Sequence, residues 1–215
     1  RQRPVSNPVA DPPAATFPDP VAFPPSADAD PAWAVAARAW LVQSDAKFAR
    51  RFDADEPADK LVVLRTRAVD TVVRDAWQRC VPEGDALALF AVGGYGRGEL
   101  FPQSDVDLLV VAEADVQQQA QPALSRFVAL LWDAGLQASP AVRSAAECTE
   151  AAADQTVLTA LIEARPLVAW EEEAASLQAA IGPDRVWPPR AFLDAKVAEQ
   201  RQRHARFGDT SDNLE

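Results

Sequence analysis

The chain has 215 residues, enough to bury a hydrophobic core and to form one or two domains. It carries 21 Lys and Arg against 32 Asp and Glu, a formal net charge of −11, so it lacks the general positive charge of proteins that bind nucleic-acid backbones. Two cysteines are too few for a disulfide framework, and no apolar run resembles a membrane span or a signal peptide, so we expect a soluble cytoplasmic protein.

The N-terminal part is predicted to be an arm followed by two helices. In residues 1–30 prolines recur too densely for a helix or a central strand, which indicates a flexible or draped arm. In residues 31–80 apolar side chains recur at helical spacing, which predicts two helices with buried faces. The first stripe contains Trp33, Ala37, Trp40, Leu41, Ser44, Phe48 and Phe52, and the second contains Leu61, Leu64, Ala68, Val72, Ala76 and Cys80.

A core predicted over residues 81–170 begins with an apolar run, residues 86–92, that is typical of a buried strand. Gly93 and Gly94 follow directly. They would let the backbone turn sharply and approach a ligand without a Cβ in the way, leaving amide groups free to meet phosphate oxygens. Arg97 is a candidate for a bidentate phosphate contact.

Two carboxylates, Asp105 and Asp107, stand at the start of the next apolar strand, residues 108–111. Because side chains alternate along a strand, both acids point to one face and Val106 points to the other. Like charges so placed repel each other unless a cation lies between them, and Mg²⁺ usually takes one or two carboxylates plus substrate phosphates. The pair therefore predicts a metal site for nucleotidyl transfer, in which a hydroxyl attacks the α-phosphate in line and pyrophosphate leaves.

Each signal has a simpler explanation when it is taken alone. A Gly-Gly pair usually marks an ordinary turn, and a Ser-Asp-x-Asp string is more often a solvated loop or a helix cap. Their joint occurrence within residues 93–111, directly after a buried strand, favours function. We therefore take Gly93, Gly94, Arg97 and Ser104 as candidate nucleotide-binding residues.

The rest of the core is predicted to alternate strands and helices, which gives an α/β (α+β) fold with a small mixed sheet. One helix carries Ala120, Leu124, Val128 and Leu131 on a single face, and another runs through Leu158, Leu161 and Ile162. Between them Pro140 interrupts a strand, which places that strand at a sheet edge or breaks it.

Residues 171–215 are predicted to begin a helical domain. A Trp-Pro-Pro break at residues 187–189 precedes a last helix that runs from Ala191 towards Arg206. Its basic residues are Lys196, Arg201, Arg203, His204 and Arg206. A solvated basic face is the favoured interpretation, ahead of contact with a triphosphate or an acceptor protein.

Residues 93–111, GGYGRGELFPQSDVDLLVV, resemble the polymerase-β-type nucleotidyltransferase superfamily, whose signature is a Gly-Gly or Gly-Ser turn followed by Asp-x-Asp. Within this superfamily, the sequence of the motif is most similar to that of the bifunctional uridylyltransferase/uridylyl-removing enzymes, which modify the PII nitrogen-signalling protein. Further matches are LLWD at residues 130–133, VRS at 142–144, EC at 147–148, TVLTALIEARPL at 156–167 and the segment 196–215. The resemblance covers roughly residues 60–215.

This resemblance implies transfer of UMP from UTP to a tyrosine of PII when glutamine is scarce, with Asp105 and Asp107 as catalytic and metal-binding residues for Mg²⁺. The implied partners are UTP and a PII-type protein, without nucleic acid or membrane. In the family, removal of UMP and sensing of glutamine belong to further domains, which do not fit after Glu215. Since the chain also lacks Met, we expect it to be an N-terminal fragment of a longer protein.

The chain departs from the family pattern at one strand and at one carboxylate. Residues 139–141 read Ser-Pro-Ala where the family usually has Gly-His-Ser, and residues 136–144 lack the third carboxylate that many members carry. Glu99, Glu147 and Glu163 are candidates for it by residue type alone. Besides Arg97, the visible candidates for holding a triphosphate are Arg143 and Arg165.

Two other functions stay open. A related enzyme could use another base or acceptor, as in adenylyl transfer to glutamine synthetase or to an aminoglycoside, because two carboxylates do not select a base. A nucleotide-binding regulatory module without turnover is the second alternative, indicated by the missing third carboxylate and by Pro140.

Overall fold

The computed structural model describes residues 23–24, 29–82, 86–182 and 185–206, apart from the side chains of residues 203, 204 and 206. Most of the predicted proline-rich arm therefore lies outside the described residues. The predictions for the side chains of Arg203, His204 and Arg206 lie outside them as well. Within them the chain forms eight helices around a four-stranded mixed sheet, so the predicted fold class is confirmed.

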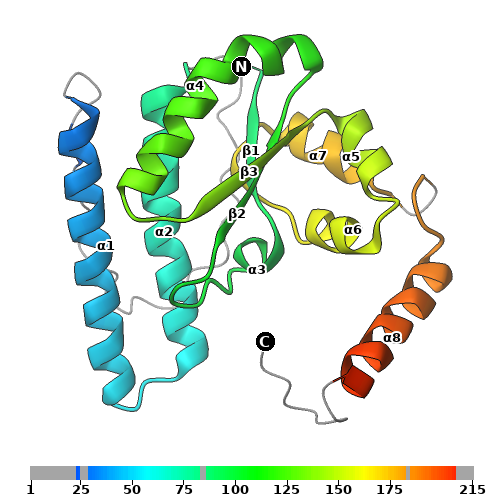
Figure 1. Cartoon of the computed structure of the whole chain (residues 1–215), viewed down its shortest axis with the longest axis horizontal. Helices are drawn as coiled ribbons and strands as arrows, with labels where there is room; N and C mark the ends of the chain where they lie inside the picture. Colours follow the sequence, from blue (N-terminus) through cyan, green and yellow to red (C-terminus); the bar gives the residue numbers. More distant parts are fainter. Residues whose placement is uncertain (1–22, 25–28, 83–85, 183–184, 207–215) are drawn as a thin grey trace.

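Two long helices, α1 (Asp30–Asp53) and α2 (Ala58–Cys80), lie side by side at one end of the molecule (Figure 1). They bury the predicted stripes against each other and against the helix that covers the sheet. Phe52 is an exception, because 58% of its side chain is exposed. It lies in the last turn of α1, beyond Phe48, which is the last buried residue of that helix.

The sheet contains β1 (Ala88–Ala91), β2 (Val106–Val111), β3 (Ala138–Arg143) and β4 (Arg165–Val168) in the order β3-β2-β1-β4. The β1 strand pairs antiparallel with β2 and with β4, whereas β2 and β3 are parallel. The other helices are α3 (Gly93–Gly96), α4 (Ala114–Asp133), α5 (Ala145–Ala151), α6 (Gln155–Ile162), α7 (Glu171–Ala180) and α8 (Pro189–Arg206).

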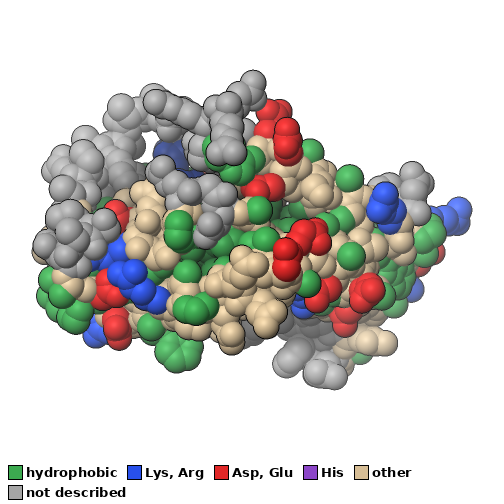
Figure 2. All heavy atoms as spheres, turned by 90° about the horizontal axis from the view of Figure 1, so that it is seen from above, with side chains coloured by type: hydrophobic (Ala, Val, Ile, Leu, Met, Phe, Trp, Pro, Cys, Tyr) green, Lys and Arg blue, Asp and Glu red, His purple; other side chains and the backbone are tan. Residues whose placement is uncertain are grey.

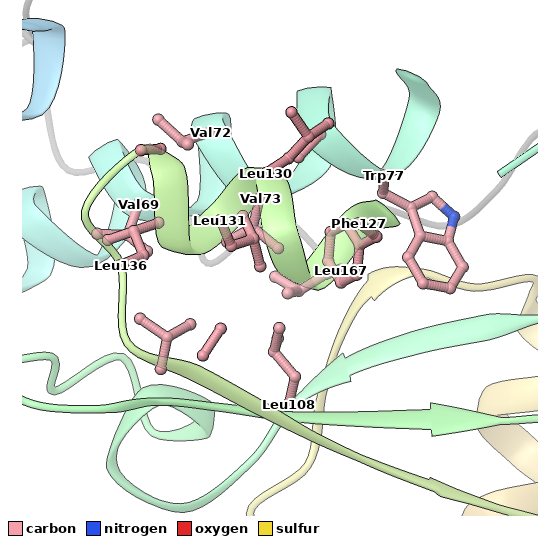
Figure 3. Close-up of a cluster of buried hydrophobic side chains, with 14 of the residues drawn as sticks. Val69, Val72, Val73, Trp77, Leu108, Phe127, Leu130, Leu131, Leu136 and Leu167 are labelled. Carbon is pink, nitrogen blue, oxygen red and sulfur yellow. The ribbon is translucent and has the colours of Figure 1, made fainter. Parts of the chain in front are cut away.

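The sheet has a hydrophobic core on each face, because successive strand side chains point to opposite sides. Leu89 and Leu108 belong to the larger core, which α1, α2 and α4 complete. Figure 3 shows this core, with valines of α2 and leucines of α4 over Leu108 and Leu167 of the sheet. Phe90 and Leu109 belong to the second core, which includes buried residues of α5, α6 and α7.

The predicted helix through Leu158, Leu161 and Ile162 is α6, but Ile162 does not lie in the second core. Leu158 and Leu161 are buried in α6, while 52% of Ile162 is exposed. Successive residues of a helix point about 100° apart, so the residue after a buried one faces away from a core that covers one side only.

Pro140 lies in an edge strand, as predicted, and the strand is continuous rather than broken. The backbone carbonyls of Gln137 and Arg143 accept hydrogen bonds from the Val106 and Ala112 amides on the β2 side. By alternation, the missing N–H of Pro140 falls on the outer side, where no ladder bond is lost. The proline therefore protects this edge from pairing with another strand.

The excess of acidic residues is visible on the molecular surface. In Figure 2 acidic side chains stand in several groups across the face, with Lys and Arg side chains between and beside them. None of the helices in the described part of the chain combines the length and the apolar character that crossing a membrane requires.

Candidate active site

The glycine motif connects two neighbouring strands at the end of the sheet. The chain leaves β1, makes the single helical turn of α3 and returns through a loop to β2, which is antiparallel to β1. The Val92 amide donates to the Asp107 carbonyl at 3.1 Å, and the amides of Gly96 and Arg97 close the turn onto the carbonyls of Val92 and Gly93. The predicted glycine turn is thus a short helix that begins beside the first residues of β2.

Gly93 brings the backbone against one of the two carboxylates. Its φ of +59° lies in the left-handed region, which other residues rarely adopt. A Cβ placed on Gly93 would lie only 3.3 Å from Oδ2 of Asp107. The absence of a side chain therefore lets the start of α3 lie directly beside the Asp107 carboxylate.

Asp105 and Asp107 flank the buried Val106 and are both exposed, as the alternation predicted. Asp107 is the second residue of β2 and Asp105 directly precedes the strand. Partial burial, and then the negative charge of Asp105, raise the pKa of Asp107 above its ordinary value. Two carboxylates that repel each other this way fit a divalent cation, because a cation would relieve both effects.

In the part of the chain that the structure describes, the pair has no third metal-binding side chain beside it. Among the residues that the structure describes, no group of three His, Cys, Asp or Glu side chains is arranged to hold a metal ion. Glu147 is committed elsewhere, since it accepts the Ser144 amide at 2.6 Å in the capping box that begins α5. The hydrogen bonds that Glu147 accepts from Ser144 and from Gln117 lower the pKa of Glu147.

Arg97 follows α3 and contacts the two remaining carboxylate candidates. Its Nε donates to Glu99 at 2.8 Å and its Nη1 to Glu163 at 2.7 Å. The hydrogen bond to Glu99 and the charge of Glu163 raise the pKa of Arg97. The third nitrogen, Nη2, lies 3.7 Å from the position that a Cβ on Gly94 would take. The guanidinium therefore lies over Gly94, 46% exposed, but in contact with carboxylates.

The other two arginine candidates do not reach the carboxylate pair. Arg143 lies at the far end of β3: its register partner is Val111, four residues along β2 from Asp107, which corresponds to about 13 Å. Arg165 forms an ion pair with the buried Asp70. Ser104 is exposed beside Asp105, and its amide donates to the Phe101 carbonyl at 3.1 Å in the turn before β2.

The α2 helix supports the loop between α3 and β2 from behind. The buried Thr66 hydroxyl donates to the Gly98 carbonyl at 2.8 Å and accepts the Leu100 amide at 3.1 Å. Arg65 donates to the Phe101 carbonyl at 2.9 Å. The contribution of α2 was not predicted, because hydroxyl and guanidinium contacts to backbone leave no periodic signal in a sequence.

Comparison with known proteins supports the chemistry that the motif predicts. Residues 72–142 match the nucleotidyltransferase domain family, and this range spans α3, the carboxylate pair and most of β3. The match confirms that the chain carries a nucleotidyltransferase domain.

Several curated relatives share most of this chain. A bifunctional uridylyltransferase/uridylyl-removing enzyme of Xanthomonas campestris pv. campestris (strain 8004) is 60% identical over 191 residues, 89% of this chain and 22% of that protein. Proteins of the same name from Xanthomonas euvesicatoria pv. vesicatoria (strain 85-10) and Methylococcus capsulatus (strain Bath) are 58% and 42% identical over 89% and 84% of this chain. The chain spans about a fifth of the length of these relatives, and the resemblance predicted from the motifs is confirmed.

Proposed function

We propose, from the premise that residues 72–142 carry a nucleotidyltransferase domain, that this chain transfers UMP from UTP to a tyrosine of a PII-type signalling protein and releases pyrophosphate. The proposal assigns it to the transferring part of a larger cytoplasmic enzyme that also removes UMP and responds to glutamine. The base follows from the name shared by the relatives. The acceptor is the one that the resemblance to the PII-modifying family implies.

The observation that carries the proposal is the carboxylate pair beside a glycine turn. Asp105 and Asp107 flank the buried Val106, and Gly93 brings the start of α3 against Asp107. Core packing does not account for two neighbouring exposed acids, nor for a place where partial burial and the charge of Asp105 raise the pKa of Asp107. A site for a divalent cation and a triphosphate accounts for both features.

In this proposal Asp105 and Asp107 would hold Mg²⁺, which would neutralise negative charge on the triphosphate. The backbone of Gly93 and Gly94 would lie against phosphate oxygens, because no Cβ occupies that space. Arg97 would exchange one of its two carboxylate partners for a phosphate oxygen. These contacts orient the α-phosphate for in-line attack by the tyrosine hydroxyl, with pyrophosphate as the leaving group.

The test is transfer to a purified PII-type protein in the presence of Mg²⁺ and each of the four nucleoside triphosphates in turn, read by mass spectrometry of the acceptor. We expect a gain of one UMP with UTP alone, and no gain with the Asp107→Asn chain. A gain with ATP in place of UTP would contradict the proposed base. Tight UTP binding by calorimetry without any transfer would favour a regulatory module instead.

A further inference from the structure

Arg165 and Asp70 form a bidentate ion pair behind the glycine turn. Nη1 of Arg165 donates to Oδ2 of Asp70 at 2.7 Å and Nη2 donates to Oδ1 at 3.0 Å. The Asp70 side chain is 8% exposed and the Arg165 side chain 14% exposed. The pair thus connects the first residue of β4 to the middle of α2, 95 positions apart in sequence.

The same guanidinium also holds the end of α3. Its Nη2 donates to the Tyr95 carbonyl at 3.2 Å and its Nε to the Gly96 carbonyl at 3.3 Å. Its central carbon lies 5.5 Å from the centre of the Tyr95 ring, within the range of a cation–π contact. One side chain therefore joins α2, β4 and both carbonyls at the end of the glycine turn.

A helix of four residues needs such outside contacts, because one turn has too few internal hydrogen bonds to be stable alone. Gly96 packs against the backbone at the end of α6, where a Cβ would clash with the Glu163 carbonyl oxygen and lie 3.0 Å from that of Ala91. The far end of α3 is thus fastened by Arg165 and by this contact, while its beginning lies beside Asp107.

We propose that Asp70 and Arg165 are positioning residues that fix the Gly93–Gly96 turn relative to Asp105 and Asp107, and thereby set the affinity for UTP. The choice of ligand rests on the proposed function. Neither residue touches the substrate: the turn acts on the phosphates, and the ion pair acts on the turn.

The informative variant is Arg165→Lys. Lysine keeps the charge that the buried Asp70 requires but lacks the planar fork that reaches Asp70 and two carbonyls together. Arg165→Ala would leave the buried Asp70 with only the ion pair to Arg74, whose Nη2 lies 4.0 Å from Oδ2, and would destabilise the fold. Asp70→Asn is a second variant that keeps the volume of the side chain.

Arg126→Lys provides a matched control away from the site. Arg126 makes a comparable bidentate contact with Asp30, at 2.6 Å and 2.7 Å, between α4 and the start of α1. Arg126→Lys removes a bidentate contact, made through Nε and Nη2 in a more exposed ion pair, without touching α3.

Two measurements test the proposal on the whole chain. Hydrogen exchange reports the amides of Arg97, Gly98 and Glu99, which donate to carbonyls within the turn. Steady-state transfer reports the KM for UTP and kcat separately. For Arg165→Lys and Asp70→Asn we expect at least about tenfold faster exchange and about a tenfold higher KM, with kcat within about threefold of the original. Arg126→Lys should change neither quantity.

Unchanged exchange in Arg165→Lys would overturn the proposal, and so would faster exchange with an unchanged KM. A purely structural defect would reduce the folded fraction, which lowers the apparent kcat and leaves KM as it was. If the original chain neither binds nor transfers UTP, the proposed function fails. The exchange comparison then decides the positioning role by itself: faster exchange supports it, and equal exchange refutes it.

Discussion

At the scale of single residues, Asp107 carries a conflict between folding and chemistry. Burial and the charge of Asp105 raise its pKa, so the ionised form that a metal requires is also the form that the folded chain disfavours. Gly93, which rests against the same carboxylate, has a backbone conformation that suits few other residues. Glycine adopts this conformation without strain, so the cost at the site is electrostatic, and a bound cation would relieve it.

Asp107→Asn should therefore abolish transfer and stabilise the fold. We expect a loss of at least about a hundredfold in activity, because even indirect partners of a metal contribute 10- to 100-fold. A raised folded-state pKa means that ionisation destabilises the fold, so removal of the charge should raise the melting temperature at pH 7. The gain should shrink as the pH falls through the pKa of Asp107. Calorimetry and the transfer assay measure both effects.

Asp133→Asn is the control for this change, since Asp133 is exposed at the end of α4 and far along the chain from the motif. It should retain activity. A fully active Asp107→Asn chain would contradict the metal assignment, and a lower melting temperature would contradict the electrostatic argument.

Two neighbouring glycines should respond differently to alanine. A Cβ on Gly94 would meet the Glu99 carbonyl oxygen at 3.6 Å and the Arg97 side chain at 3.7 Å, which are ordinary contacts. Gly94→Ala should therefore fold normally but weaken UTP binding about tenfold, because the new methyl group occupies space proposed for phosphate. Titration calorimetry with UTP measures this. Unchanged affinity would remove Gly94 from the site.

Gly96→Ala should instead damage the fold. Its Cβ would overlap the Glu163 carbonyl oxygen and press on that of Ala91, and neither backbone group is free to move away. Overpacking of this kind typically costs about 1–3 kcal/mol in the free energy of unfolding, which chemical denaturation measures. A change below about 0.5 kcal/mol would mean that α3 is not held against α6 as described.

The sequence indicated candidate residues that lie within one motif and missed those whose partners are distant in sequence. Asp105, Asp107 and Gly93 lie within one motif, so alternation along a strand and the need for a tight turn identify them. The sequence indicates Arg165 only as a candidate triphosphate contact and carries no signal for Asp70. Their pairing depends on how β4 and α2 pack, and 95 positions of separation leave no periodic signal.

At the scale of elements, long amphipathic helices and apolar strands were predictable, whereas short segments without an apolar run were not. The four-residue β4 begins with Arg165-Pro166 and has only one buried residue, so it lacks the apolar run of a strand. Its partner β1 supplies the pairing, with an irregular register between Leu89 and Phe90. The seven residues of α5 have little periodicity, and the Ser144–Glu147 capping box was the available signal for their start.

The start of α1 should show a pH-dependent contribution to stability. Asp30 accepts hydrogen bonds from Arg126 of α4 and from the buried Arg79 of α2, and these bonds lower its pKa despite partial burial. A lowered pKa means that the ionised form stabilises the fold above its unfolded-state pKa and that this contribution is lost as the pH falls through the folded-state value.

Asp30→Asn should accordingly destabilise the chain by about 1–3 kcal/mol at pH 7, and by progressively less under acid conditions. Urea denaturation at a series of pH values measures the difference. Asp53→Asn, at the exposed other end of the same helix, should change stability little. A difference that is independent of pH would show that the charge of Asp30 does not stabilise the junction of α1, α2 and α4.

At the scale of the whole molecule, the net negative charge affects which ligands the chain binds. A net charge of −11 opposes the binding of any anion, and the proposed site adds two carboxylates where a triphosphate would lie. The domain boundaries predicted from the sequence, at residues 31, 81 and 171, stay predictions. The nucleotidyltransferase match at 72–142 falls largely within the third segment and begins in the second.

UTP should therefore stabilise the chain only when Mg²⁺ is present. A ligand at a hundred times its Kd contributes about 2.7 kcal/mol to the folded state, which corresponds to a rise of roughly 5–10 °C in Tm for a chain of this size. Without the cation, the charge of the triphosphate meets Asp105, Asp107 and the acidic surface unscreened, so UTP with a chelator should give no shift. Differential scanning calorimetry measures both conditions, with Asp107→Asn as a variant that should not respond to either. An equal shift with and without Mg²⁺ would mean that UTP binds away from the carboxylate pair, since repulsion at that pair makes the nucleotide and the cation depend on each other.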